Sequence, residues 1–228
     1  KTEIPIVISA GGATLEEVDR ALNEIYKYHS DVALMHCIIQ YPAKMKDANL
    51  KVIPSLKNIL EIPVGFSNNG FEDDEGNIDF TEIPYNATAV GMDLYEIHIT
   101  LDRYMEGVDQ GFSTEPDELK KMVALINKTR EDFINSKPLS LNDKYLGSGV
   151  KKTLLCEEYV RDFAYKSIFS ITQINQGDKL SIDNIKCLRP GEYKTGLEPK
   201  YFDILVENFT AKHDIEPFEP INWKDISD

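Results

Sequence analysis

Short apolar runs alternate with amphipathic stretches of helical period over the first 133 residues of the chain. The runs are rich in Val, Ile, Leu and Met and show little period-two alternation, which is typical of parallel strands covered on both faces. Their starts lie about 30 residues apart, the length of one strand–helix unit. Four such units predict an α/β fold, either a doubly wound sheet or half of a (β/α)₈ barrel. The runs are Ile4–Ser9, Val32–Cys37, Ile62–Phe66 and Met92–Ile97.

The first amphipathic stretch carries a clear helix start. Thr14 is a capping residue, Glu17 follows three positions later, and the apolar residues from Leu15 onward fall on one face. Further helices are expected over about 50–60, 85–90 and 114–133. The turn from Ser9 to Thr14 contains two glycines without the G-x-G-x-x-G spacing, so a tight strand-to-helix turn is favoured over a dinucleotide loop.

The pattern changes after residue 135. Residues 136–160 are rich in Ser, Lys, Asn and Gly and lose helical periodicity, which predicts a linker. Residues 161–228 combine short apolar segments with frequent turns and clustered prolines, which predicts a small β-rich domain. The predicted organisation is therefore an α/β domain over 1–135, a linker, and a β-rich domain.

Charge and composition exclude several classes of partner. The chain has 25 basic and 39 acidic residues and a net charge of −14, which argues against nucleic acid and anionic membranes as partners. No apolar stretch approaches the roughly 18 residues that span a bilayer. Three scattered cysteines form no disulfide framework, so a reducing cytoplasm is expected. Six acidic residues between Glu72 and Glu82 predict a solvated loop rather than a metal cage.

The carboxyl ends of parallel strands are where α/β proteins bind ligands. Here those ends present hydroxyl, amide, phenol and imidazole groups, which suit an oxygen-rich ligand such as a sugar or a phosphate. His36 lies within an apolar run, so a hydrogen-bonded core histidine is favoured over a ligand. Cys37 is interpreted as a small buried apolar residue rather than a nucleophile. The groups concerned are Ser9, Tyr41, Ser67, Asn68, Asn69, Glu96, His98 and Thr100.

Several local motifs together resemble successive blocks of the sialic acid synthase (N-acetylneuraminate synthase) family. The most specific is His98-Ile99-Thr100-Leu101-Asp102-Arg103, which continues into Phe112-Ser113 and Glu115-Pro116-Asp117-Glu118-Leu119. The tail, with Gly177-Asp178 and Leu188-Arg189-Pro190-Gly191, resembles that family's antifreeze-like (SAF) domain. Other matching blocks are Pro5–Ser9, Ala13–Glu17, His36-Cys37, Tyr41-Pro42-Ala43 and Val64-Gly65-Phe66-Ser67.

The resemblance implies a TIM (β/α)₈ barrel followed by a β-clip SAF domain, with the four strands here corresponding to strands five to eight. The preceding half, which would carry an acidic residue and lysines, is missing from the chain, so Lys1 is expected to start a fragment that is inactive alone. Family members condense phosphoenolpyruvate with N-acetylmannosamine or a related amino sugar to a nine-carbon 2-keto acid. The resemblance also implies a divalent cofactor, Mn²⁺ or Mg²⁺, and a domain-swapped homodimer.

Residue roles follow from the resemblance position by position. Ser9 is expected near the phosphate of phosphoenolpyruvate, Tyr41 and Ser67 along the substrate pocket, and Asp109 at the sugar. Arg189 is expected to reach the partner's active site and face the acyl group of the sugar, and His98 to bind the metal.

One departure from the family pattern affects the metal site. Asn69 stands where the family has a second metal-binding histidine, and an amide oxygen is a weaker ligand than imidazole for manganese. The alternative is therefore a noncatalytic sugar-binding or regulatory relative with a degraded metal site. The amino sugar, of neuraminic, legionaminic or pseudaminic type, stays open.

Overall fold

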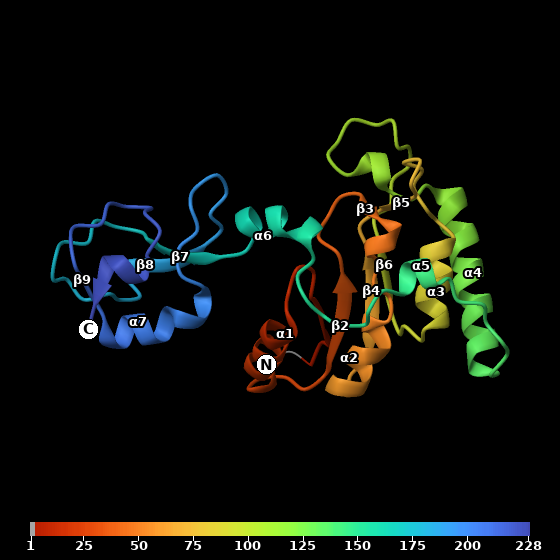
Figure 1. Ribbon diagram of the computed structural model, residues 1–228, viewed down its shortest axis with the longest axis horizontal. Helices are drawn as coiled ribbons and strands as arrows, with labels where there is room; N and C mark the ends of the chain where they lie inside the picture. Colours follow the sequence, from red (N-terminus) through yellow and green to blue (C-terminus); the bar gives the residue numbers. More distant parts are fainter. Residues whose placement is uncertain (1–2) are drawn as a thin grey trace. The chain divides into compact units, whose positions relative to one another are not determined.

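The chain forms two compact units, residues 1–157 and 158–228, each with its own hydrophobic core (Figure 1). The computed structural model describes residues 3–228. Over this described range, no helix combines the length and apolarity that crossing a membrane requires.

The first unit is built on a four-stranded parallel sheet in the order β1 (Ile6–Ser9), β2 (Val32–Cys37), β4 (Val64–Asn68) and β6 (Tyr95–Ile97). Each successive strand is added to the same edge of the sheet. A doubly wound sheet reverses its strand order at a switch point, whereas a (β/α)₈ barrel adds its strands in sequence. The order therefore selects the half-barrel from the two predicted α/β arrangements.

Helices cover one face of this sheet. They are α1 (Leu15–Tyr26), α2 (Val52–Leu60), α3 (Glu82–Ala89) and α4 (Pro116–Ile134), the last two side by side (Figure 1). The capping box at the start of α1 is confirmed, because Thr14 N donates to Glu17 Oε2 at 2.8 Å and Glu17 N donates to Thr14 Oγ1 at 3.3 Å. On β1, half-buried Ile6 and Ile8 alternate with exposed Val7 and Ser9. The second face of the sheet is thus open at this strand.

Minor elements complete the first unit. Strands β3 (Ala43–Lys44) and β5 (Phe71–Glu72) form a parallel pair. The short helices are η1 (Met45–Asp47), η2 (Gln110–Phe112), α5 (Asp143–Leu146) and η3 (Leu155–Glu157).

The acidic segment 72–82 uses its carboxylates locally. Glu72 pairs with Lys44 at 2.7 Å, and Asp73 Oδ1 accepts from the backbone N–H of Glu75 and Asn77, at 2.9 Å each. Asp79 accepts from the N–H groups of Glu82 and Ile83 at 2.9 and 2.7 Å, which caps the start of α3.

The segment 136–160, predicted as a linker, is mostly packed into the first unit. Tyr145 and Leu146 belong to its hydrophobic core, and their carbonyls accept from Leu50 N and Lys51 N at 3.0 and 2.9 Å. Glu157 is fully buried. The sequence of this segment shows no helical period because a few buried apolar residues and backbone hydrogen bonds hold it in place, rather than one face of a helix.

His36 is a core histidine, as its apolar surroundings predict. It is 1% exposed, and its Nε2 lies 2.9 Å from Ala48 O, so the neutral ring donates there. Burial, and secondarily the charge of Lys151, lowers the pKa of His36 to about 3.

This buried imidazole predicts a loss of stability in acid. Below about pH 6.5 the unfolded chain binds a proton at His36 that the folded chain refuses, so the free energy of unfolding falls with pH by up to about 1.4 kcal/mol per unit until about pH 3. We expect His36→Gln to have a shallower slope than the parent in urea titrations between about pH 5 and 6.5. His29→Gln is the control, and parallel curves for parent and His36→Gln would contradict the assignment.

The second unit pairs β7 (Ser167–Ser170) with β8 (Ile185–Leu188) and β9 (Thr210–Ala211) with β10 (Ile226–Ser227), both antiparallel. Its helices are α6 (Glu158–Ala164), η4 (Pro199–Tyr201), α7 (Phe202–Asn208) and η5 (Trp223–Asp225). The short strands agree with the predicted β-rich pattern. Helix α7 was not predicted, since seven residues are too few to show a clear helical period.

Candidate active site

Polar side chains line up on one face of the half-barrel sheet, at its carboxyl edge. The register places Cys37 of β2 opposite Ser67 of β4, and Ser67 opposite Glu96 of β6. Alternation along β2 places Cys37 on the same face as Met35, which is opposite Ser9 of β1. Strands β2, β4 and β6 thus place the thiol of Cys37, the hydroxyl of Ser67 and the carboxylate of Glu96 in one row. The hydroxyl of Ser9, on β1, lies on the same face next to this row.

Ser67 and Glu96 are directly connected. Ser67 Oγ donates to Glu96 Oε1 at 2.6 Å, a short, charge-assisted hydrogen bond. Ser67 is buried whereas Glu96 is exposed. The pair therefore holds a carboxylate with a fixed orientation at the open face of the sheet.

A second chain of contacts runs from β2 to the loop after β6. Asn69, which is buried, donates its amide N–H groups to Ile38 O and to Cys37 Sγ, both at 3.1 Å. Because a carbonyl oxygen only accepts, Ile38 O fixes which end of the amide carries nitrogen. Asn69 Oδ1 consequently faces His98 Nε2 at 3.3 Å. On the other side of the ring, His98 Nδ1 lies 3.8 Å from Asp109 Oδ2.

Aromatic rings enclose His98. Its ring centroid lies 5.4 Å from that of Phe112 and 6.3 Å from that of Tyr41, in edge-to-face arrangements. Tyr41, whose peptide bond to Pro42 is cis, is also tilted against Phe112 at 6.0 Å. Gly70 allows this approach, because its φ is +78° and a Cβ there would lie 2.7 Å from Phe112 Cβ. Partial burial raises the pKa of Tyr41, so the ring presents a neutral phenol.

Cys37 is a packing residue at the centre of the row. Burial raises the pKa of its thiol, although hydrogen bonds with Ser67, Ser9 and Asn69 act in the opposite direction. A thiol with a raised pKa is a poor nucleophile at neutral pH. The predicted role as a small buried apolar residue therefore fits, with the addition that the thiol contacts three predicted site residues.

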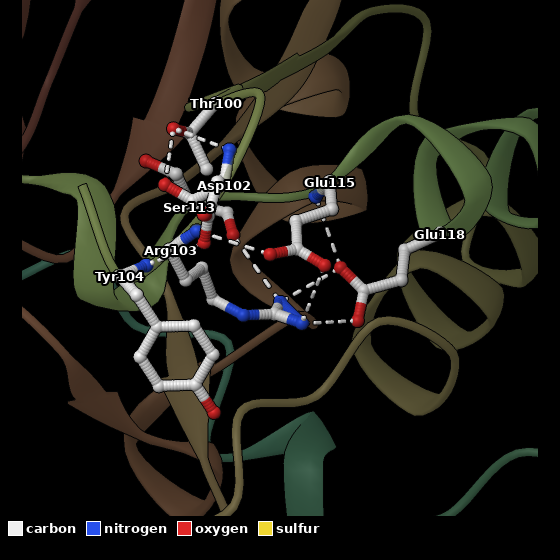
Figure 2. A network of polar contacts seen from close by, with 7 residues as sticks. All are labelled: Thr100, Asp102, Arg103, Tyr104, Ser113, Glu115 and Glu118. Atoms are coloured by element: carbon white, nitrogen blue, oxygen red, sulfur yellow. Dashed lines mark hydrogen bonds and ion pairs between the residues drawn. The ribbon is translucent and has the colours of Figure 1, made fainter.

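Arg103 organises the loop that carries His98 and Asp109 (Figure 2). Its two terminal nitrogens donate to the two oxygens of Glu118, at 2.7 and 2.6 Å. The same guanidinium lies 3.5 Å from Glu115 Oε2 and stacks on Phe80 at 4.9 Å. Arg103 N also donates to Glu115 Oε1 at 3.0 Å. Since Glu115 and Glu118 form the capping box of α4, the network ties the loop to that helix.

Backbone pairing fixes the two ends of this loop beside each other. Thr114 N donates to His98 O at 2.9 Å, and Thr100 N donates to Thr114 O at 3.0 Å. Ser113 Oγ donates to Asp109 O at 2.7 Å. His98 and Asp109 thus sit on a loop held at both ends, which preorganises the site.

Known proteins that resemble this chain in sequence and in structure show its family and its fold. The sequence model of the NeuB family matches residues 1–137. Spore coat polysaccharide biosynthesis protein SpsE of Bacillus subtilis is 37% identical over 97% of this chain and 58% of its own length. This chain belongs to the NeuB family. The crystal structure of SpsE superposes with a TM-score of 0.88 over 99% of this chain and 62% of that protein.

Other NeuB relatives have names that state an activity. Pseudaminic acid synthase of Campylobacter jejuni (serotype O:2) is 31% identical over 93% of this chain and 55% of its length. N,N'-diacetyllegionaminic acid synthase of the same organism is 32% identical over 81% of this chain and 50% of its length. The family is that of the sialic acid synthases, and the chain spans about half to three-fifths of the length of these relatives.

The half-barrel brings together most of the residues predicted for a NeuB site. Ser9, Tyr41, Ser67, Asn69, His98 and Asp109 lie at one edge of the sheet, linked through Cys37 and His98. Arg189 follows β8 and is exposed in the second unit. From the sequence, Glu96 is only one of the polar groups at the strand ends, Phe112 and Arg103 are only parts of a matching motif, and Glu157 is not singled out. The presence of Arg103, Glu115 and Glu118 within that motif was the available signal for the loop network.

The predicted metal site offers an imidazole nitrogen and an amide oxygen. His98 Nε2 and Asn69 Oδ1 face each other, and the Asn69 oxygen is the end of the amide left for a ligand. An imidazole nitrogen and an amide oxygen fit two positions around Mn²⁺ or Mg²⁺. Between residues 3 and 228, no group of three or more His, Cys, Asp or Glu side chains is arranged to hold a metal ion. The described residues therefore fit as part of a ligand set.

Proposed function

We propose that the protein carrying this chain condenses phosphoenolpyruvate with an N-acylated amino sugar. The reaction joins C3 of phosphoenolpyruvate to the aldehyde carbon of the open-chain sugar, takes up water and releases inorganic phosphate, giving a nine-carbon 2-keto acid. The observation that carries the proposal is the contact series Asn69–His98–Asp109 beside the Ser67–Glu96 pair, at the edge where parallel strands bind ligands. Membership of the NeuB family and the names of its synthases support it.

Each side chain has a chemically defined task in this proposal. Ser9 offers its hydroxyl to the oxygens of phosphoenolpyruvate. Ser67 lines the pocket and donates its hydroxyl to Glu96, and the carboxylate so oriented accepts a hydrogen bond from a hydroxyl or water. Tyr41 and Phe112 form an apolar side of the pocket next to His98. Asp109, beside His98 Nδ1, favours the tautomer that leaves Nε2 free as a ligand, and it accepts from sugar hydroxyls.

His98 and Asn69 would hold a divalent cation, Mn²⁺ or Mg²⁺. When bound, such a cation polarises the aldehyde of the sugar as a Lewis acid. Asn69 is positioned for this by its donation to Ile38 O, which holds the amide oxygen toward His98.

In this proposal the second unit, residues 158–228, is an SAF domain. In a domain-swapped homodimer its exposed Arg189 would face the acyl group of the sugar bound by the partner. A planar, permanently charged guanidinium is suited to orienting an acyl oxygen.

The test is product formation by the natural full-length protein. Incubation with phosphoenolpyruvate, Mn²⁺ and the amino-sugar precursor of neuraminic, legionaminic or pseudaminic acid is expected, with one of the three precursors, to release phosphate and give a 2-keto acid whose mass is that of the sugar plus pyruvic acid. Residues 1–228 alone are expected to release none, because the resemblance assigns the acid and lysines to the other half-barrel. No product from any precursor would overturn the proposal.

A noncatalytic sugar-binding relative is the second candidate, and Asn69 is the observation that favours it. An imidazole at position 69 cannot make both hydrogen bonds that the Asn69 amide makes with Ile38 O and Cys37 Sγ. If the full-length protein is inactive and Asn69→His restores turnover, the site is a decayed one. Robust turnover with asparagine in place would support an enzyme that uses the amide.

A further inference from the structure

Glu157 is a buried carboxylate that joins three segments of the first unit. Its exposed fraction is 0%. Oε1 accepts from Gly12 N at 2.8 Å and from Ile39 N at 3.1 Å, and Oε2 accepts from Leu154 N at 2.9 Å. Gly12 and Ile39 are 145 and 118 residues away along the chain. A carboxylate is costly to bury unless hydrogen bonds replace its water, and here backbone N–H groups do so.

Both distant segments lead directly into predicted substrate contacts. Gly12 lies in the β1–α1 turn, three residues after Ser9, and Ile39 lies midway between Cys37 and Tyr41. The two segments also pack against each other, because a Cβ at Gly11 would collide with the Ile39 side chain. A shift of Glu157 would therefore displace two segments, the one that leads back to Ser9 and the one that leads on to Tyr41.

The segment 153–157 also holds the β1–α1 turn through the carbonyl group of Gly12. Thr153 Oγ1 donates to Gly12 O at 2.7 Å. The φ of Gly12 is +68°, a left-handed conformation in which its N–H and C=O both meet the 153–157 segment. A glycine-rich turn after a strand often cradles a phosphate with its N–H groups. Here a carboxylate of the protein itself occupies the Gly12 N–H, so this amide is already used.

We propose that Glu157 is a positioning residue for the phosphoenolpyruvate side of the site: by holding the Gly12 and Ile39 amides together, it sets the separation of Ser9 and Tyr41. This rests on the proposed function, because the substrate is the one assigned there. The residue touches no reacting atom and acts through the two backbone segments.

Glu157→Gln is the discriminating variant, because it keeps the size and removes one acceptor. Whichever way the amide turns, its NH₂ group faces a backbone N–H of Leu154 or those of Gly12 and Ile39. In the full-length protein we expect the KM for phosphoenolpyruvate to rise about tenfold, with kcat and the KM for the sugar within about threefold of the parent. Glu158→Gln, the same change at the exposed neighbouring residue, is the control.

A second measurement needs no turnover. In the full-length protein, Glu157→Gln is expected to speed hydrogen exchange at the Gly12 and Ile39 amides by at least about tenfold relative to Glu158→Gln. If Glu157→Gln does not fold, Thr153→Val replaces it as the test variant, because it removes only the hydrogen bond to Gly12 O. We expect Thr153→Val to raise the KM for phosphoenolpyruvate about threefold.

The outcomes separate this inference from the proposed function. Faster exchange with an unchanged KM for phosphoenolpyruvate would show that Glu157 has only a structural role and would overturn the inference. Unchanged exchange at the two amides would also overturn it. Faster exchange in Glu157→Gln, together with a full-length parent that forms no product, would refute the proposed function and, with it, the substrate assigned to the positioning role. A selective rise in that KM supports both.

Discussion

Replacing His98 with alanine is expected to lower kcat/KM of the full-length protein by about a thousandfold and to abolish high-affinity Mn²⁺ binding. His98 supplies the imidazole that faces Asn69 Oδ1 at 3.3 Å, and its other nitrogen lies beside Asp109. Lewis-acid stabilisation contributes several kcal/mol to a transition state, and about 4 kcal/mol corresponds to a thousandfold in rate. Calorimetry with Mn²⁺ and steady-state kinetics measure the two effects separately.

Stability should change little in the same variant. His98 is about one-third exposed, so truncation removes few packed contacts, and the loop keeps its backbone bonds through Thr100 and Thr114. His29→Ala, which removes an imidazole whose ring contacts the backbone of Asp31, is the control and should retain full activity. If His98→Ala binds Mn²⁺ and turns over like the parent, the metal assignment is wrong.

Replacing Arg103 with methionine is expected to destabilise the first unit by about 3 kcal/mol and to lower activity by about a hundredfold. The variant leaves the carboxylates of Glu115 and Glu118 facing each other without the cation that separates them. Without that anchor, the loop is held to α4 only by its backbone bonds, which include Arg103 N to Glu115 Oε1, and the separation of His98 and Asp109 is less well fixed. Urea denaturation and steady-state kinetics measure the two losses.

Arg103→Lys distinguishes geometry from charge. An ammonium keeps the positive charge but cannot bond both oxygens of Glu118 in a planar, bidentate manner. We therefore expect an intermediate loss of about 1–2 kcal/mol. Arg130→Met removes an exposed arginine of α4 and is the matched control. Equal stabilities of Arg103→Met and Arg130→Met would show that the network does not hold the loop.

The four strands of the main sheet and helices α1 to α4 were predictable because their patterns are local. The second apolar run coincides with β2, and the Thr14 capping box is present as predicted. The segment 136–157 and helix α7 were not recognised, since their residues are fixed by contacts with distant parts of each unit and show no extended period of their own. Position within the strand order likewise predicted Ser67, Asn69 and His98 at the carboxyl edge.

The sequence by itself determined the α/β class, the strand ends that carry the polar residues, and the motifs that resemble a sialic acid synthase. Only the tertiary structure decided the register that pairs Ser67 with Glu96, the direction of the Asn69 amide, and the burial of Glu157 between Gly12 and Ile39. The physical reason is sequence separation. Strand ends follow from the periodicity of neighbouring residues, whereas hydrogen-bond partners up to 145 residues apart are chosen by the packing of the whole unit.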